Sequence, residues 1–375
     1  MQAPPRAPRY VLINGELRPV PLSPPAFILS SLFSVGTKLR VLRDLLGRST
    51  PPHTDESVAS FVRRKFSREI LEKLVGPFVS GIYAGDPEKL SLQSAFPQLY
   101  EAEKSAGSVI RGLLRAGKNS STPKEKPSLQ TFRNGNQTLI HALAANLGSH
   151  LRCGAEAISV APPSGKTTGF EITVLANGQE ELFVADRLIV ATPTSQAAGL
   201  LRDVDPQFEI CLRQIEYAPV AVVSLGYART AIRHSLRGFG FLVPRSSTLR
   251  ILGTVWNSSL FPDRAPEGHI LVTSFVGGAT DPHAMALSQH DIVATVHREL
   301  SPILGISGQL SFSSVWTCER AIPQFHIGHA EQINRLNQLR TKYPNLQFVG
   351  NYLRGPALGT CIEQALTVAQ DAGKK

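Results

Sequence analysis

Alternating apolar and polar residues around tight turns predict β-structure at several places along the chain. YVLI and ELRPV flank Asn14-Gly15, so residues 10–20 are expected to form a hairpin, because this dipeptide tolerates the positive φ angles of a tight turn. Residues 170–184 repeat the layout around Asn177-Gly178. The segments AVVSLGY, FGFLV, LRILGTVW and HILVTSFVGG make residues 220–278 a strand-rich block.

Helical spacing of apolar residues predicts helices in other parts of the chain. Residues 25–48 carry Phe33, Leu39, Leu42 and Leu46 at such spacings, with lysine and arginine between them, which indicates a basic amphipathic segment. Apolar stripes predict further helices over residues 55–75, 139–147 and 291–300. The run GKNSSTPKEKPS, residues 117–128, has no large apolar side chain and is expected to be a mobile loop. The chain is therefore of mixed α/β class.

The net charge indicates which kinds of molecule the protein could bind, and the cysteines indicate the redox state of its cellular compartment. The 375 residues carry a net charge of +10 at a pI near 9.6, which favours an anionic partner: a nucleic acid, an anionic membrane surface or a polycarboxylate. The basic residues lack interleaved aromatic side chains, so we expect no nucleic acid partner. Four widely spaced cysteines without a CxxC pair favour a reducing cytoplasm. No apolar run reaches the roughly 20 residues of a membrane span, so a membrane contact would be peripheral.

Two segments have the layout of a cofactor-binding edge. FVGNYLRGPALGTCIEQAL, residues 348–366, has a strand end, a glycine-rich turn and a helix whose N-terminal amides could face an anion or an electron-rich ring. RLIVATP, residues 187–193, reads as a buried parallel strand. An ordinary turn before a packing helix explains the first segment equally well, and no GxGxxG occurs in the chain. HIGH, residues 326–329, has no acidic or cysteine partner nearby, so we predict no metal site.

Longer motifs resemble one family, the oxygen-dependent, flavin-containing protoporphyrinogen oxidases of haem synthesis. The resemblance is carried by GDPEKLS and the FPQLYEAEKSAGSVI that follows it, and by FRNGNQTL, FGFLVP, LFPDRAP, TSFVGG and FVGNYLRGPALG, in the family's order between residues 9 and 369. It implies a flavin amine oxidase-like fold with a discontinuous FAD domain, a sheet-based substrate domain and a helical membrane-binding domain. RLIVATP and the closing loop would both touch the flavin.

The resemblance also implies roles for individual residues. Arg9 would pair with a substrate propionate, which suits an arginine fork. Leu242 and Val255 would sandwich one pyrrole ring, Phe275 would stack on another, and Gly81 would line the cavity. On the cofactor side, the implied FAD contacts are the Ala157 backbone near adenine, Trp316 near the flavin, and Leu358 and Gly359 at the isoalloxazine. No side chain is assigned as acid or base.

By the same analogy the chain divides into six segments. A substrate-domain hairpin would occupy 1–23, the helical membrane-associated domain 24–115, and the loop and return to the substrate domain 116–136. FAD-domain parts would occupy 137–194 and 324–375, with the substrate domain at 195–323. Family members begin with a βαβ unit carrying GxGxxG, on the order of 90 residues that are not in this sequence. We therefore expect the chain as given to bind FAD poorly.

The implied activity is oxidation of protoporphyrinogen IX to protoporphyrin IX with O₂ as acceptor, by an enzyme that is cytoplasmic and peripherally bound to an anionic membrane. Coproporphyrinogen III is an alternative substrate, because both porphyrinogens present propionates to an arginine. A non-catalytic remnant that keeps the tetrapyrrole and membrane surfaces is a second alternative. A related amine oxidase or carotenoid desaturase is disfavoured by GDPEKLS and LFPDRAP. A homodimer or a ferrochelatase contact is left open.

Overall fold

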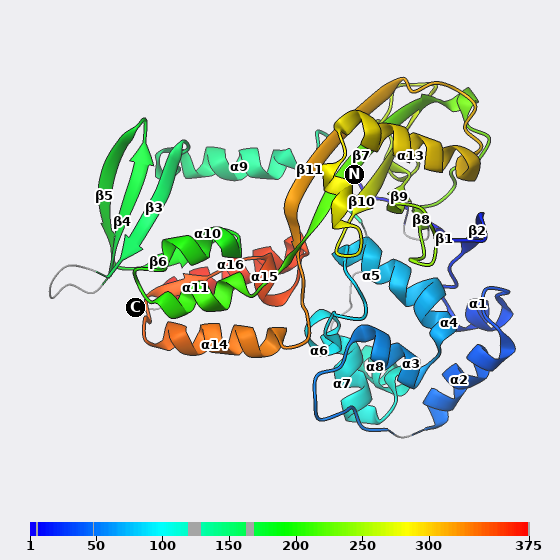
Figure 1. The fold of residues 1–375 in the computed structure, drawn as a ribbon, viewed down its shortest axis with the longest axis horizontal. Helices are drawn as coiled ribbons and strands as arrows, with labels where there is room; N and C mark the ends of the chain where they lie inside the picture. The colour runs from blue at the N-terminus through cyan, green and yellow to red at the C-terminus, as the bar shows by residue number, and fades with distance from the viewer. Residues whose placement is uncertain (5–6, 48, 119–128, 163–168, 374–375) are drawn as a thin grey trace. The chain divides into compact units, whose positions relative to one another are not determined.

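The computed structural model describes residues 1–4, 7–47, 49–118, 129–162 and 169–373. The chain forms two compact units, which are described separately (Figure 1). Unit 1 consists of Met1–Asn136 and Tyr217–Ile322, and unit 2 consists of Gln137–Glu216 and Pro323–Lys375. Most of the predicted loop at 117–128 lies outside the described residues.

Within the described residues, unit 1 is built on a seven-stranded sheet of order β11-β7-β10-β9-β8-β1-β2. The strands are β1 (Arg9–Ile13), β2 (Glu16–Pro19), β7 (Tyr217–Ala228), β8 (Gly240–Leu242), β9 (Ile251–Val255), β10 (His269–Gly277) and β11 (Phe312–Pro323). The predicted hairpin at Asn14-Gly15 is confirmed, with φ angles of 52° and 81° at these two residues. β1 pairs in parallel with β8, although the two strands are far apart in sequence.

One face of this sheet is closed by α13 (Gln289–Leu304). Ile292, Val296, Leu300 and Leu304 recur every four residues on this helix and enter a core with buried side chains of β7, β9 and β10. Ser288 caps the helix by accepting a hydrogen bond from the Asp291 amide at 3.1 Å. Shorter elements complete the sheet part: η3 (Arg229–Ala231), α12 (Asn257–Leu260) and η4 (Pro282–Ala286).

The rest of the described part of unit 1 is mainly helical. Its elements are α1 (Pro24–Leu29), α2 (Val35–Leu46), α3 (Val58–Lys65), α4 (Arg68–Ile70), η1 (Leu71–Val75), α5 (Gly76–Tyr83), α6 (Leu92–Ala95), α7 (Pro97–Ala106) and α8 (Val109–Lys118). The prediction of one helix over residues 55–75 was wrong. α3 begins at Val58 and ends at Lys65, because the next residue, Phe66, has φ and ψ of −124° and −97°, which are not helical. The Ser67 side chain then caps the start of α4 by accepting a hydrogen bond from the Ile70 amide.

In its described residues, unit 2 contains two separate sheets and several helices. β6 (Leu188–Val190) and β12 (Leu346–Phe348) form a parallel pair, and β3 (Ala155–Ala161), β4 (Phe170–Ala176) and β5 (Gln179–Ala185) form an antiparallel sheet. The helices are α9 (Gln137–Leu147), η2 (Gly148–His150), α10 (Thr194–Leu200), α11 (Pro206–Arg213), α14 (His329–Thr341), α15 (Asn351–Arg354) and α16 (Leu358–Gly373). The predicted hairpin at Asn177-Gly178 and the helix at 139–147 are confirmed.

Residues 195–216, which were predicted to begin the substrate domain, lie in unit 2. The reason is aromatic packing: the ring of Phe208 on α11 lies 5.7 Å from the ring of Tyr343 and 5.8 Å from that of Phe348, between ring centroids. Phe208 is fully buried, so these contacts attach α11 to the β12 side of the unit.

Candidate functional site

The strand register of unit 1 places four of the predicted site residues on one face of the sheet. Leu242 on β8 pairs with Gly253 on β9, which pairs with Phe275 on β10. Two residues away, Arg9 on β1 pairs with Gly240, and Gly240 pairs with Val255. Residues directly opposite one another point to the same face, and so do residues two apart on a strand. The four side chains therefore share the face opposite to α13.

Two glycines occupy the middle of this face. A Cβ on Gly240 would lie 2.0 Å from the Thr254 carbonyl oxygen, and one on Gly253 would lie 2.8 Å from that of Phe241. Gly240 also has a φ of 139°, which strongly favours glycine. The sheet therefore has no side chain of its own at these two positions, and Cδ2 of Leu242 lies 3.0 Å from where a Cβ on Gly253 would be. These glycines were not singled out from the sequence, although FGFLVP and ILGTVW each carry one at a strand position.

Helix α5 covers part of the same face through Gly81. A Cβ placed on Gly81 would lie 2.5 Å from Cδ2 of Leu242, so the helix and β8 approach more closely than a larger residue permits. The end of α5 is fixed by Ala84, which adopts a left-handed φ of 47° and whose carbonyl oxygen accepts a hydrogen bond from the Ala279 amide at 2.7 Å. Phe275 is half-buried against this end of the helix.

Arg9 lies at the edge of the face with an exposed side chain. Its guanidinium stacks 5.3 Å from the centroid of the Phe239 ring. Among the described residues it has no carboxylate within ion-pair distance. Because its donors are not engaged by an acidic side chain, Arg9 can bind a carboxylate that borders the apolar side chains of this face.

In unit 2, the parallel pairing of β6 with β12 brings together the two segments with a cofactor-type layout. The pair aligns Val190 with Phe348, so residues 191–193 after β6 and residues 349–351 after β12 leave the sheet at the same edge. Ligands of open α/β sheets bind at this edge. Thr192 Oγ1 at this edge is buried and makes no hydrogen bond among the described residues. Leu358 and Gly359 form the exposed first turn of α16. An orphan hydroxyl, a helix N-terminus and an exposed apolar residue fit the ring end of a flavin.

The remaining two predicted cofactor residues lie elsewhere. Ala157 is exposed on β3, at a shift in the register with β4, and so belongs to the three-stranded sheet. Trp316 lies on β11 in unit 1 with 60% of its surface exposed. The described residues contain no group of three acidic, histidine or cysteine side chains that could hold a metal ion, and the His329 ring stacks on Phe325 with centroids 4.2 Å apart.

One protein family matches the sequence of both units. Residues 3–372 match the model of the flavin containing amine oxidoreductases. The chain belongs to this family. It is an oxidoreductase by that membership, and the predicted flavin amine oxidase-like fold is confirmed.

Relatives within the family act on porphyrinogens, according to their names. The chain is 36% identical to chloroplastic protoporphyrinogen oxidase 1 of Arabidopsis thaliana, over 97% of this chain and 72% of the relative. It is 31% identical to coproporphyrinogen III oxidase of Bacillus subtilis, over 97% and 78%. A crystal structure from Exiguobacterium sp. 255-15, provisionally assigned as a protoporphyrinogen oxidase, shares the fold with a TM-score of 0.78 at 23% identity, over 98% of this chain and 80% of that one.

Proposed function

We propose that this oxidoreductase catalyses the FAD-dependent oxidation of protoporphyrinogen IX to protoporphyrin IX, with O₂ as the electron acceptor. The observation that carries the proposal is the sheet face on which Arg9, Leu242, Val255 and Phe275 surround two glycines, Gly240 and Gly253, near Gly81. A porphyrinogen is a broad apolar ring with acidic tails, and this face offers apolar side chains and an arginine that pairs with no carboxylate in the described part of the chain. The names of the relatives support the same substrate class.

Each residue of the face has a separate task in this proposal. Leu242 and Val255 pack on one pyrrole ring and Phe275 stacks on another, which fixes the ring plane and excludes water. Arg9 holds a propionate and sets the ring's rotation. When bound, the flavin supplies the hydride-accepting chemistry, and Thr192, Leu358 and Gly359 are the residues we propose to hold its ring. The Ala157 backbone and Trp316 are proposed as further FAD contacts.

The test is replacement of Arg9 by methionine, read out by binding of the product. Loss of a charge-assisted hydrogen bond is worth about 1.5–3 kcal/mol, so we expect porphyrin affinity to fall about tenfold or more. Quenching of protoporphyrin IX fluorescence measures this without any need for bound flavin. Arg18→Met is the matched control, because Arg18 lies on β2 in an exposed ion pair with Glu16. Equal affinities for the Arg9 variant, the control and the wild type would refute the assigned face.

Turnover with added FAD then decides between the candidate substrates. Oxygen-dependent porphyrin formation is measured for protoporphyrinogen IX and for coproporphyrinogen III with the same preparation. A higher kcat/KM for coproporphyrinogen III would favour the activity named for the Bacillus subtilis relative. Product binding without turnover, under saturating FAD, would favour the non-catalytic alternative.

We also propose that the helical part of unit 1 binds an anionic membrane surface peripherally. Val35, Leu39, Leu42 and Leu46 form one exposed stripe along α2, called here the leucine stripe, and exposed Arg40 and Arg43 lie beside it. Apolar residues bordered by arginine are typical of a helix that lies in the lipid interface. Among the described residues, no helix is both long and apolar enough to cross a bilayer.

A further inference from the structure

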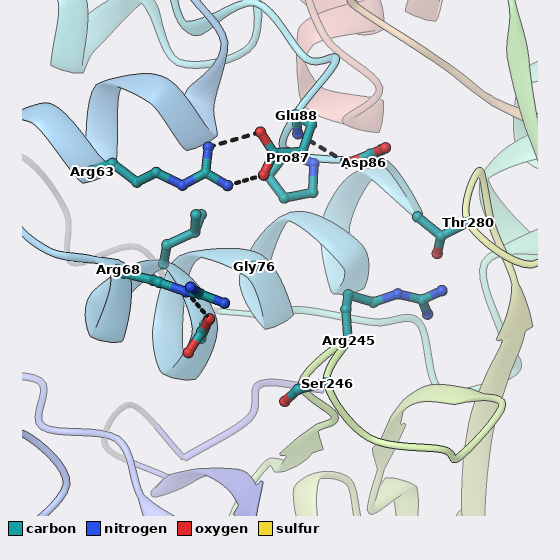
Figure 2. Close-up of a pocket in the computed structure, with 11 residues that line it drawn as sticks. Arg63, Arg68, Gly76, Asp86, Pro87, Glu88, Arg245, Ser246 and Thr280 are labelled. Atoms are coloured by element: carbon teal, nitrogen blue, oxygen red, sulfur yellow. Dashed lines mark hydrogen bonds and ion pairs between the residues drawn. The ribbon is translucent and has the colours of Figure 1, made fainter.

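A cavity of about 600 Å³ lies in unit 1, between helical residues of α3 to η1 and loops that follow β8 and β10. Its volume falls within the range of small-molecule sites. Arg63, Arg68, Asp86, Arg245 and Thr280 are among the residues that line it (Figure 2). Gly81, Leu242 and Phe275 do not line it, so the cavity is separate from the apolar face described above.

Two of the three arginines in this cavity already have acidic partners. Arg63 forms a two-pronged ion pair with Glu88, in which Nη1 donates to Oε2 at 2.9 Å. Arg68 pairs with Glu72 on the next helical turn, with Nε 2.6 Å from Oε1. Both pairs are substantially exposed, and each compensates its own charge. Neither arginine therefore requires a ligand.

Arg245 differs from these two. Its side chain is half-buried, and among the described residues no carboxylate oxygen lies within 4.0 Å of its guanidinium. Burial lowers the pKa of Arg245, against the more distant attraction of Asp281 and Asp86. Removing a guanidinium from water without a hydrogen-bonded partner is costly, so this group favours any anion that reaches it.

The direction of the side chains indicates where such an anion would bind. In Figure 2 the Arg245 guanidinium and the Thr280 hydroxyl face one another across the right-hand side of the cavity. Arg245 follows β8 and Thr280 follows β10, so both donors stand on loops anchored by the sheet. A guanidinium and a hydroxyl can together donate to two oxygens of one oxoanion.

We propose that Arg245 and Thr280 form a binding subsite for a small oxoanion, a carboxylate or a phosphate group, separate from the ring-binding face. Charged side chains line much of this cavity, and an apolar ligand would leave the half-buried Arg245 guanidinium without a hydrogen-bond partner. A ligand held here would contact residues of both the helical part and the sheet part of unit 1, and so would stabilise their junction. The site does not depend on the proposed substrate or on a flavin.

Two probes test the subsite on the full chain: sodium phosphate and sodium succinate, each titrated against sodium chloride at equal ionic strength. We expect a saturable rise in the thermal midpoint with at least one probe. In Arg245→Gln the apparent Kd for that probe should rise about tenfold or more, because a charge-assisted pair is lost. Arg298→Gln is the matched control, because Arg298 is an exposed arginine on α13 and does not line the cavity. Its Kd should equal that of the wild type.

The outcomes separate the ligand classes and can overturn the proposal. Tighter binding of phosphate assigns the site to phosphate-bearing ligands, and tighter binding of succinate assigns it to carboxylates. If Arg245→Gln fails to fold, Thr280→Val provides the second variant, for which we expect a rise of a few fold in Kd. A wild-type chain that responds to both probes only as it does to chloride refutes the subsite, as does an unchanged Kd in both cavity variants.

Discussion

Helices α13 and α2 of unit 1 bury opposite kinds of side chain. Between the sheet and α13 a cluster of buried apolar side chains packs together, among them Tyr227, Trp256 and Leu300. In the helical part, α2 buries Thr37 and Asp44 and leaves its leucine stripe exposed, with 60% of Leu39 and 76% of Leu46 accessible. The first arrangement is that of an ordinary globular core. The second leaves apolar surface that water does not favour, which indicates a partner that is itself apolar.

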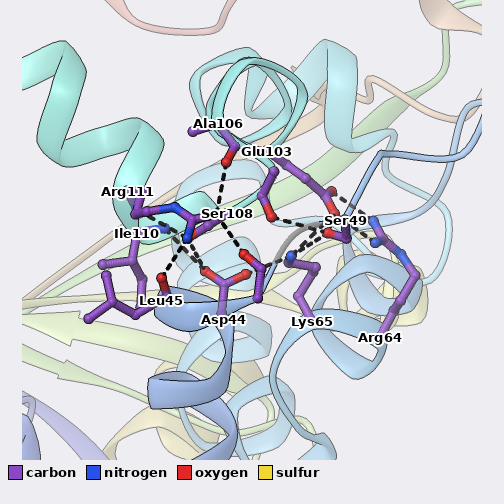
Figure 3. A network of polar contacts seen from close by, with 12 residues as sticks. Asp44, Leu45, Ser49, Arg64, Lys65, Glu103, Ala106, Ser108, Ile110 and Arg111 are labelled. Carbon is purple, nitrogen blue, oxygen red and sulfur yellow. Dashed lines mark hydrogen bonds and ion pairs between the residues drawn. The ribbon is translucent and has the colours of Figure 1, made fainter.

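A network of charged groups holds α2 in this orientation (Figure 3). Lys65 Nζ lies 2.6 Å from Asp44 Oδ1 and 3.3 Å from Glu103 Oε1, and donates to Ser49 Oγ at 2.7 Å. Arg64 donates to both oxygens of Glu103, at 2.8 and 2.9 Å. Asp44, Lys65 and Glu103 come from α2, α3 and α7, so the network joins three helices without using the leucines of α2.

The largest loss of stability in the helical part is expected when Lys65, the cation at the centre of the network, is removed. Lys65→Met leaves the buried carboxylate of Asp44 without its ion-pair partner, and breaking a buried pair in this way costs about 3–5 kcal/mol. We expect amide hydrogen exchange in α3 and α7 to accelerate accordingly, while exchange in α13 stays unchanged. Hydrogen-exchange mass spectrometry resolves these segments separately.

Lys104→Met is the control for this change. Lys104 and Glu101 form an exposed pair at 4.0 Å on the same helical part, and such pairs contribute between zero and about 1 kcal/mol. If Lys65→Met behaves like Lys104→Met, the polar network does not hold the helices together. In that case α2 would have to be held mainly by its half-buried apolar residues Val41 and Leu45.

Acid should weaken the helical part by a smaller amount. Burial of Glu103 would raise its pKa, but hydrogen bonds from Arg64 and Ser49 outweigh burial and lower the pKa from 4.5 to about 2. A depressed folded-state pKa gives stability that is present above pH 4.5 and is lost as the pH falls towards 2. The difference corresponds to at most about 3 kcal/mol.

Glu103→Gln provides the check on this assignment. The variant should be less stable than the wild type at pH 7, and the two should converge near pH 2, because protonation removes the same charge from the wild type. The measurement is exchange in α7 as a function of pH. A constant gap between the two proteins from pH 7 to pH 2 would show that Glu103 is not the group that titrates.

Local elements of this fold were predictable from the sequence, and pairings between distant strands were not. Asn14 and Asn177 adopt φ angles of 52° and 51° at the predicted hairpin turns, because an Asn-Gly pair encodes its turn locally. The break at Ser67 was missed because the apolar period continues through it. β11 was missed because FSSVWTCERAIP lies at the sheet edge, is largely exposed and has no regular alternation.

The candidate site likewise depends on pairings between distant strands, which the sequence does not predict. Arg9, Leu242, Val255 and Phe275 were selected by family resemblance, and no periodicity in the chain indicates that β1 pairs with β8 more than 200 residues away. Arg245 was not selected at all, because its distinguishing property is the absence of a nearby carboxylate in three dimensions. Helical spacing alone does not show whether an apolar face points to the core or outwards. For residues 25–48 the basic residues among the leucines favoured a membrane-surface or partner face, and Leu39, Leu42 and Leu46 are exposed.

Leu39→Ser is expected to change folding stability the least. It should nevertheless weaken the proposed membrane contact clearly. Leu39 contributes little to the core because it is 60% exposed, so the free energy of unfolding should change by less than about 0.5 kcal/mol. Transfer of a leucine side chain into an apolar phase is worth about 1.5–3 kcal/mol, so partitioning into vesicles with anionic lipid should weaken about tenfold. Leu182→Ser is the matched control, because Leu182 is 64% exposed on β5 in unit 2. Vesicle sedimentation measures both variants, and an equal loss of binding in the two would mean that general exposed apolar surface, not the leucine stripe, contacts the membrane.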